Sequence, residues 1–94
     1  MKLLWDEHKR LANLKKHGFD FAEAVLLDWA SAVLEPAKAD RYGRQRHKAI
    51  GHFSGSIASI IFATLGSEAI SIISFRSASA EERKTFYEQD KASH

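Results

Sequence analysis

The chain has 94 residues, of which 45% are hydrophobic, so it is long enough for one domain with its own core and too short for two. It contains no cysteine, which excludes disulfides, thiolate metal sites and cysteine nucleophiles. The formal net charge is only +2, but positions 41–67 carry lysines and arginines and no carboxylate. Such a segment favours a polyanion or an acidic protein as partner, although a plain solvated surface would have the same composition. With no apolar run long enough for a membrane span and a charge too early for a signal peptide, we expect a cytoplasmic protein.

The first half of the chain predicts a strand followed by two helices. Residues 3–5 form a short apolar run typical of an edge strand, and Asp6 is placed to cap a helix that begins at about Glu7. That helix is expected to end at Gly18, because a glycine after a run of cations is a common stop signal. A second helix is expected after Asp20, with its apolar face formed by Phe21, Ala24 and Val25.

A polar loop is expected between the two halves of the chain, from Pro36 to about Gly43, because proline ends any preceding helix. Residues 46–53, 57–63 and 69–75 then predict three strands joined by short turns, and short turns imply an antiparallel meander. Ser79 and Glu82 form a capping-box pattern that opens a C-terminal helix. The predicted fold class is α+β, with helices packed on a small antiparallel sheet.

Motifs spread over most of the chain resemble the BrnT family. The N-terminal part of the resemblance consists of Trp5-Asp6-Glu7, Lys9, Asn13, Lys16-His17-Gly18 and Phe21. The C-terminal part consists of Arg46, Ile50-Gly51, Gly55, Ile72-Ile73-Ser74-Phe75-Arg76, Ala78 and Glu82-Arg83. The match keeps the family's order and spacing from one end of the chain to the other.

The resemblance implies that residues 1–94 form a single toxin domain with a RelE-like fold. It further implies the toxin of a type II toxin–antitoxin pair, a metal-independent endoribonuclease that inhibits translation by cleaving RNA and needs no cofactor. The implied partner is a BrnA-like antitoxin with a ribbon-helix-helix domain, and operator DNA would be bound only through that antitoxin.

RNA cleavage without a metal requires groups that stabilise charge on the phosphate and groups that move protons. Arg46 and Arg76 are the leading candidates for phosphate binding, since guanidinium groups stay charged and bind phosphate bidentately. Lys48, His17 and His52 are candidates for proton transfer. Further RNA contacts are expected from Lys9, Lys16, Arg44, His52 and Trp5.

Each of these candidates also has a structural interpretation. Arg76 could pair with a helix carboxylate such as Glu82, His17 could bond the terminal carbonyls of its helix, and Trp5 could pack in the core. Strict alternation along the last strand would place Arg76 on the same face as Ile72, but the pairing register is not fixed by the sequence. No histidine spacing typical of a metal site is present.

The chain departs from the family pattern at three positions, where Gly66, Ser71 and Ser77 stand in place of cations. Fewer cations near the expected site would weaken phosphate binding. An alternative hypothesis is therefore a weakened or inactive BrnT-like module that pairs with the antitoxin for transcriptional autoregulation.

Overall fold

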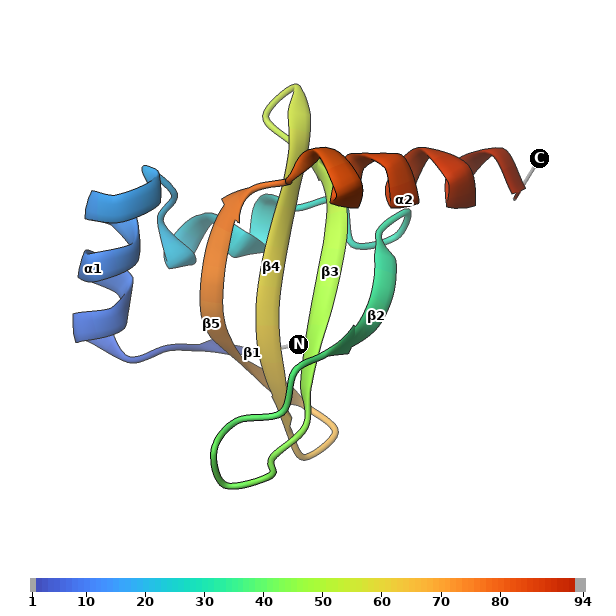
Figure 1. Cartoon of the computed structure of the whole chain (residues 1–94). Coiled ribbons are helices and arrows are strands. Elements are labelled where there is room, and N and C mark those ends of the chain that lie inside the picture. Colours follow the sequence, from blue (N-terminus) through green and yellow to red (C-terminus); the bar gives the residue numbers. More distant parts are fainter. Residues whose placement is uncertain (1, 93–94) are drawn as a thin grey trace.

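The protein is described by a computed structural model that covers residues 2–92, with side chains to Gln89. Five strands form one sheet in the order β1-β5-β4-β3-β2, and three helical segments pack against it (Figure 1). The elements are β1 (Lys2–Leu4), α1 (Glu7–His17), the 3₁₀ helix η1 (Phe21–Leu26), β2 (Val33–Ala37), β3 (Arg46–Phe53), β4 (Ser56–Leu65), β5 (Ala69–Ser77) and α2 (Ala80–Ala92). Among the described residues, no helix is both long and apolar enough to span a membrane.

The sheet is mostly antiparallel, which confirms the α+β class and the predicted meander of β3, β4 and β5. The exception is β1, which pairs with β5 in parallel and forms one edge of the sheet. A parallel neighbour is possible here because two helices, three strands and their loops separate β1 from β5 in the chain.

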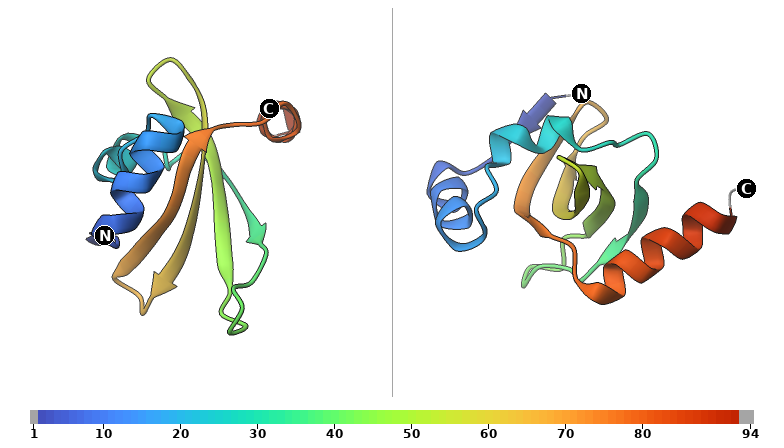
Figure 2. Two further views of the ribbon diagram at one scale, coloured as in Figure 1. Left: turned by 60° about the vertical axis from the view of Figure 1, so that its left-hand side comes forward. Right: turned by 90° about the horizontal axis from the view of Figure 1, so that it is seen from above.

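The sheet has two differently covered faces, seen from above in Figure 2. The face covered by α1 and η1, called the α1 face here, holds the main core, in which Phe21, Ile60 and Phe75 are fully buried. The opposite face, called the α2 face, is covered only in part by α2 and holds a smaller cluster of Ile50, Ile57, Ala78 and Phe86.

Helix α1 is attached to the sheet by a polar side chain. Asp6 caps the helix as predicted, and its carboxylate accepts a hydrogen bond from the backbone N–H of Lys9 at 3.0 Å. The buried residue of the helix is Asn13, whose amide donates to the carbonyl of Phe75 at 2.7 Å and accepts from its N–H at 3.2 Å. Asn13 therefore fixes α1 against β5.

The second helix differs from its prediction. It is a 3₁₀ helix with three residues per turn, so the buried side chains recur at every third position, at Phe21, Ala24 and Leu27. The prediction that Val25 belongs to the apolar face was wrong, since Val25 is 63% exposed.

A strand was missed between the two halves of the chain. β2 contains Pro36, which the sequence analysis took for the start of a loop. Proline is tolerated at this place because β2 is an edge strand paired only with β3, so an N–H on its outer side is not needed. The true loop covers residues 38–45 and extends past the end of the sheet (Figure 1).

A β-bulge in β5 changes the face on which Arg76 lies. Ile61 pairs with Ser74 and Phe62 with Ile72, so Ile73 is the extra residue. Ile72 and Phe75 consequently point into the same core although they are three residues apart. Arg76 then lies on the opposite, α2 face, and the prediction that it shares a face with Ile72 was wrong.

Candidate nucleic-acid interface

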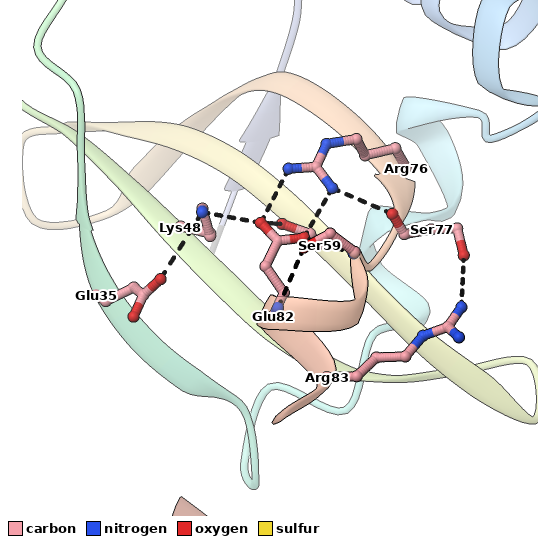
Figure 3. Close-up of polar contacts among 8 residues, drawn as sticks. Glu35, Lys48, Ser59, Arg76, Ser77, Glu82 and Arg83 are labelled. Carbon is pink, nitrogen blue, oxygen red and sulfur yellow. Dashed lines mark hydrogen bonds and ion pairs between the residues drawn. The ribbon is translucent and has the colours of Figure 1, made fainter. Parts of the chain in front are cut away.

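Arg76 and Lys48 meet on the α2 face around one buried carboxylate (Figure 3). The Glu82 carboxylate accepts two hydrogen bonds from the Arg76 guanidinium, at 2.7 and 2.9 Å. It also forms an ion pair with the Lys48 Nζ at 2.8 Å. The Ser59 hydroxyl lies 3.4 Å from the same carboxylate. These four residues, with Ser79, are called the Glu82 network.

Ser79 connects this network to the start of α2. Its backbone N–H donates to Glu82 Oε1 at 2.9 Å, and its hydroxyl accepts from the backbone N–H of Glu82 at 3.1 Å. This reciprocal pair is the predicted capping box. The Glu82 side chain thus caps α2 and also fixes Arg76 and Lys48 on the sheet.

The electrostatics of the network keep Glu82 ionised. Burial alone would raise the pKa of Glu82, but bonds from Arg76, Lys48 and the Ser79 N–H together hold that pKa well below its usual range. The same carboxylate raises the pKa of Arg76. At neutral pH Glu82 is therefore an anion that orients its neighbours and has no proton to donate.

A second group of cations lies at the end of the sheet from which the loop of residues 38–45 extends. This surface is called the basic groove, and it is lined by Lys9, Lys38, Ala39, Asp40, Arg41, Tyr42, Arg44 and Arg46. It adjoins a cavity of about 280 Å³ that shares Lys9, Arg44 and Arg46 and is also lined by Ser71 and Ile73. The groove brings together cations from α1, the loop and β3.

All of these cations except Arg44 lack an ion pair. Arg44 is paired with Asp40 at 2.7 Å, whereas Lys9, Lys38, Arg41 and Arg46 pair with no carboxylate among the described side chains of residues 2–89. Arg46 also lies two residues before Lys48 on one face of β3, about 7 Å along the strand. The basic groove and the Glu82 network are therefore neighbouring parts of one surface.

The other predicted site residues lie apart from the groove. His52 is exposed on the α2 face, with its ring edge-on to Phe86 at 4.9 Å. Trp5 is partly buried against the main core and donates its indole N–H to Glu7 at 3.2 Å, in line with its structural interpretation. Lys16 and His17 lie in the last turn of α1. His17 is about 12 Å along the helix axis from Lys9.

Two residues of the groove were missed by the sequence analysis. Asp40 organises the loop, and Tyr42 exposes an aromatic ring beside Arg41 and Arg44. The signal for Tyr42 was present, since an aromatic residue between arginines is typical of nucleic-acid-binding segments. The signal for Asp40 was an aspartate shortly before Gly43, a common turn pattern.

The surface can bind a polyanion, and its cations are held by different means. Arg76 and Lys48 are oriented by a buried carboxylate, whereas Arg46 and Lys9 are free to pair with phosphate. Within the described part of the chain, no group of three or more His, Asp or Glu side chains could hold a metal ion. Fold and surface together define a small α+β protein with a cationic face next to its C-terminal helix.

Comparison with known proteins names the family. The family model described as "Ribonuclease toxin, BrnT, of type II toxin-antitoxin system" matches residues 5–82. The chain therefore belongs to the BrnT toxin family, as its motifs indicated. A crystal structure of the Brucella abortus ribonuclease toxin BrnT is similar, with 49% identity and a TM-score of 0.70 over 84% of this chain and 97% of the other. No curated protein gives a match.

Proposed function

We propose that this protein is a metal-independent endoribonuclease with a RelE-like fold, which acts in the cytoplasm and inhibits translation by cleaving RNA. The observation that carries the proposal is the free pair of Arg46 and Lys9 beside the oriented pair of Arg76 and Lys48. RNA offers phosphates at regular intervals, so neighbouring cations on one face suit it well. Membership in a family of ribonuclease toxins supports the same activity.

The proposed chemistry divides the work among the cations. Arg46 binds the scissile phosphate, and Arg76, oriented by Glu82, stabilises the charge that builds on the phosphate oxygens. The ribose 2′-hydroxyl loses its proton to a general base and attacks phosphorus in line, while the bond to the 5′-oxygen breaks and a general acid protonates that oxygen. The products are a 2′,3′-cyclic phosphate and a 5′-hydroxyl. Lys48 and His52 share the α2 face with both arginines and are the nearer candidates for proton transfer. His17 could take part only with a substrate that also reaches the far end of α1.

Cleavage of purified RNA in the presence of a chelator tests this proposal. Wild-type protein should cleave a long RNA in EDTA, and Arg46→Ala should reduce the rate about 10²- to 10³-fold while the melting temperature stays unchanged. Lys84→Ala is the matched control, because Lys84 is an exposed cation on α2 and lines neither surface. Intact RNA after incubation with folded wild-type protein would refute the activity.

A binding module without catalysis is the second candidate. In its favour, Arg76 and Lys48 are already paired with Glu82, and Ser71 lines the cavity beside Arg46 where the family pattern has a cation. In this hypothesis the basic face binds the antitoxin for transcriptional autoregulation, which predicts no RNA cleavage and no growth arrest when the protein is expressed alone. The chelator experiment and a growth assay together separate the two candidates.

The proposed protein partner is an antitoxin of the BrnA-like, ribbon-helix-helix type, as expected for a toxin of a type II pair. Operator DNA would be bound by the antitoxin and not by this chain. Co-expression with a ribbon-helix-helix protein encoded beside the toxin should yield a stable complex that retards operator DNA. The toxin alone should fail to retard the same DNA in a sequence-specific way.

A further inference from the structure

We propose that the loop of residues 38–45 is a recognition element for single-stranded RNA, in which an unpaired base stacks on Tyr42. The inference rests on the proposed function in taking RNA as the ligand, and it adds the residue that contacts a base. It concerns binding, so it stands whether or not the bound RNA is then cleaved.

Tyr42 is an aromatic side chain that the fold does not use. It is 68% exposed and belongs to neither core cluster, whereas the other aromatic residues of the sheet region, such as Phe62 and Trp29, pack against the main core. An exposed ring has a flat apolar face that can stack on any base. The ring is therefore available to a ligand without a change in the core.

Two arginines flank the ring. The guanidinium carbons of Arg41 and Arg44 lie 4.9 and 5.3 Å from the ring centroid, within the range of cation–π contacts. These contacts orient the ring and place positive charge next to it, while leaving most of Tyr42 exposed. Arginine planes also stack on bases, so a base can take the place of a guanidinium group on the ring or stack on that group.

The loop that holds Tyr42 is preorganised by Asp40. The Asp40 carboxylate accepts hydrogen bonds from the backbone N–H groups of Tyr42 and Arg44, both at 2.9 Å, and pairs with the Arg44 guanidinium at 2.7 Å. Two backbone bonds of 3.0 Å close the turn, from Gly43 N–H to Asp40 and from Asp40 N–H to Arg44. Gly43 supplies the left-handed conformation that the turn requires.

The charge of Asp40 is offset within the loop by Arg44, with which its carboxylate pairs. Its side chain is only 9% exposed, and the Arg44 N–H, followed by the Arg44 side chain and the Tyr42 N–H, holds the pKa of Asp40 below its usual value. The carboxylate thus faces the loop itself. The cations Lys9, Lys38 and Arg46 line the same groove as Tyr42, where they can contact phosphates on either side of a stacked base.

This combination favours single-stranded RNA over a duplex and over an acidic protein. Bases in a duplex are stacked on one another and cannot reach the ring, whereas bases of a single strand can be splayed out. The carboxylates of an acidic protein would be attracted by the cations, but they have no flat ring that could stack on Tyr42. The ring next to the phosphate-binding cations is what points to a nucleic acid with unpaired bases.

Fluorescence anisotropy with a labelled 2′-O-methyl RNA of about 12 nucleotides tests the inference, because this RNA cannot be cleaved through its 2′-hydroxyl. Tyr42→Ala should weaken binding of the single strand about 5- to 150-fold, and Tyr42→Phe, which keeps the ring, should bind within about twofold of wild type. Tyr87→Ala is the matched control, because Tyr87 is an exposed tyrosine on α2, and it should have no effect. Tyr42→Ala should leave the melting temperature unchanged.

Two further ligands identify the interaction. Polyphosphate carries the charges without bases, and poly-glutamate represents an acidic protein. Binding of either ligand should be unaffected by Tyr42→Ala, whereas Arg46→Ala should weaken polyphosphate binding.

Equal affinities of wild type and Tyr42→Ala for the single strand would overturn the inference while the proposed function stood. If Tyr42→Ala weakened the binding of poly-glutamate as much as that of the single strand, the inference would also be overturned, in favour of a protein contact. Failure of the wild type to bind any RNA would instead refute the proposed function itself.

Discussion

Replacement of Glu82 by glutamine separates the charge of the Glu82 network from its shape. Glutamine has nearly the same size and also serves at the third helical position of a capping box, so the start of α2 is preserved. What is lost is the negative charge and one acceptor, which leaves part of the Arg76 guanidinium opposite an amide N–H group. Arg76 then lies beside a neutral group, whereas Lys48 keeps its longer ion pair with Glu35 at 3.7 Å.

The expected loss of stability follows from the burial of the partners. Breaking a buried ion pair by removing one member costs about 3–5 kcal/mol, because the remaining charge is left without compensation. In this protein the side chains of Arg76 and Lys48 are 30% and 23% exposed, so water can solvate part of each charge after the substitution. We therefore expect the free energy of unfolding to fall by about 2–3 kcal/mol, which for a domain of this size lowers the melting temperature by about 10–20 °C.

Urea unfolding followed by circular dichroism measures this change directly. Glu81→Gln is the matched control, since Glu81 is an exposed carboxylate in the same first turn and takes no part in the network. It should cost at most about 0.5 kcal/mol through the helix dipole. If Glu82→Gln lost no more stability than Glu81→Gln, the carboxylate would gain nothing net from its two cations, and the reasoning about burial would be wrong.

Three further outcomes are expected. The pKa of Glu82 is lower in the folded protein than its ordinary value of 4.5, so the stabilising effect of Glu82 is present above about pH 4.5 and is lost as the pH falls toward the folded pKa. The melting temperature, measured from pH 6 to pH 3, should therefore fall less steeply in Glu82→Gln than in wild type. Asn13→Ala should lower the free energy of unfolding by about 2–3 kcal/mol in urea titrations, because it leaves the backbone groups of Phe75 unpaired. Finally, Glu82→Gln should steepen the salt dependence of single-stranded RNA binding by about 0.7 in the log–log slope, the increment for Arg76, since Lys48 keeps its ion pair with Glu35, whereas Glu81→Gln should not.

The elements that the sequence predicted well are those with local signals. The strand from Arg46 to Phe53 has the predicted bounds, and the helix caps at Asp6 and Ser79 are where their side chains indicated. A cap is a contact between residues two or three apart, so its chemistry can be read directly from the sequence.

The features that were missed depend on contacts between distant parts of the chain. Whether Pro36 ends an element or lies in an edge strand depends on its pairing with His47 of β3, which lies beyond the loop of residues 38–45. The extra residue at Ile73 depends on the register between β4 and β5, which alternation alone does not reveal. The 3₁₀ geometry that exposes Val25 is likewise set by packing on the sheet.

In the candidate site too, residue types could be predicted from the sequence, whereas contacts between distant residues could not. Arg46, Lys48 and Arg76 were named from residue chemistry and family motifs, and the structure brings Lys48 and Arg76 to one carboxylate. The grouping of Lys9 with Arg46 was not predictable, because α1 and the start of β3 meet only in the folded chain. Tyr42 was overlooked because an aromatic residue in a loop has no periodic pattern that marks it.

The bulge in β5 and the carboxylate of Glu82 together decide what Arg76 can do. Without the extra residue at Ile73, Arg76 would point toward the main core, where a guanidinium group would have to be desolvated. The bulge places it on the open face, and Glu82 then holds it in one orientation at the cost of one positive charge. An arginine held in this way binds an anion less strongly than a free one, but it needs no reorientation when charge develops on a phosphate. Arg46 and Lys9 supply attraction, and Arg76 supplies orientation. If the protein cleaves RNA as proposed, Glu82→Gln should therefore bind RNA more tightly and cleave it more slowly, a combination that a purely structural role for the network does not produce.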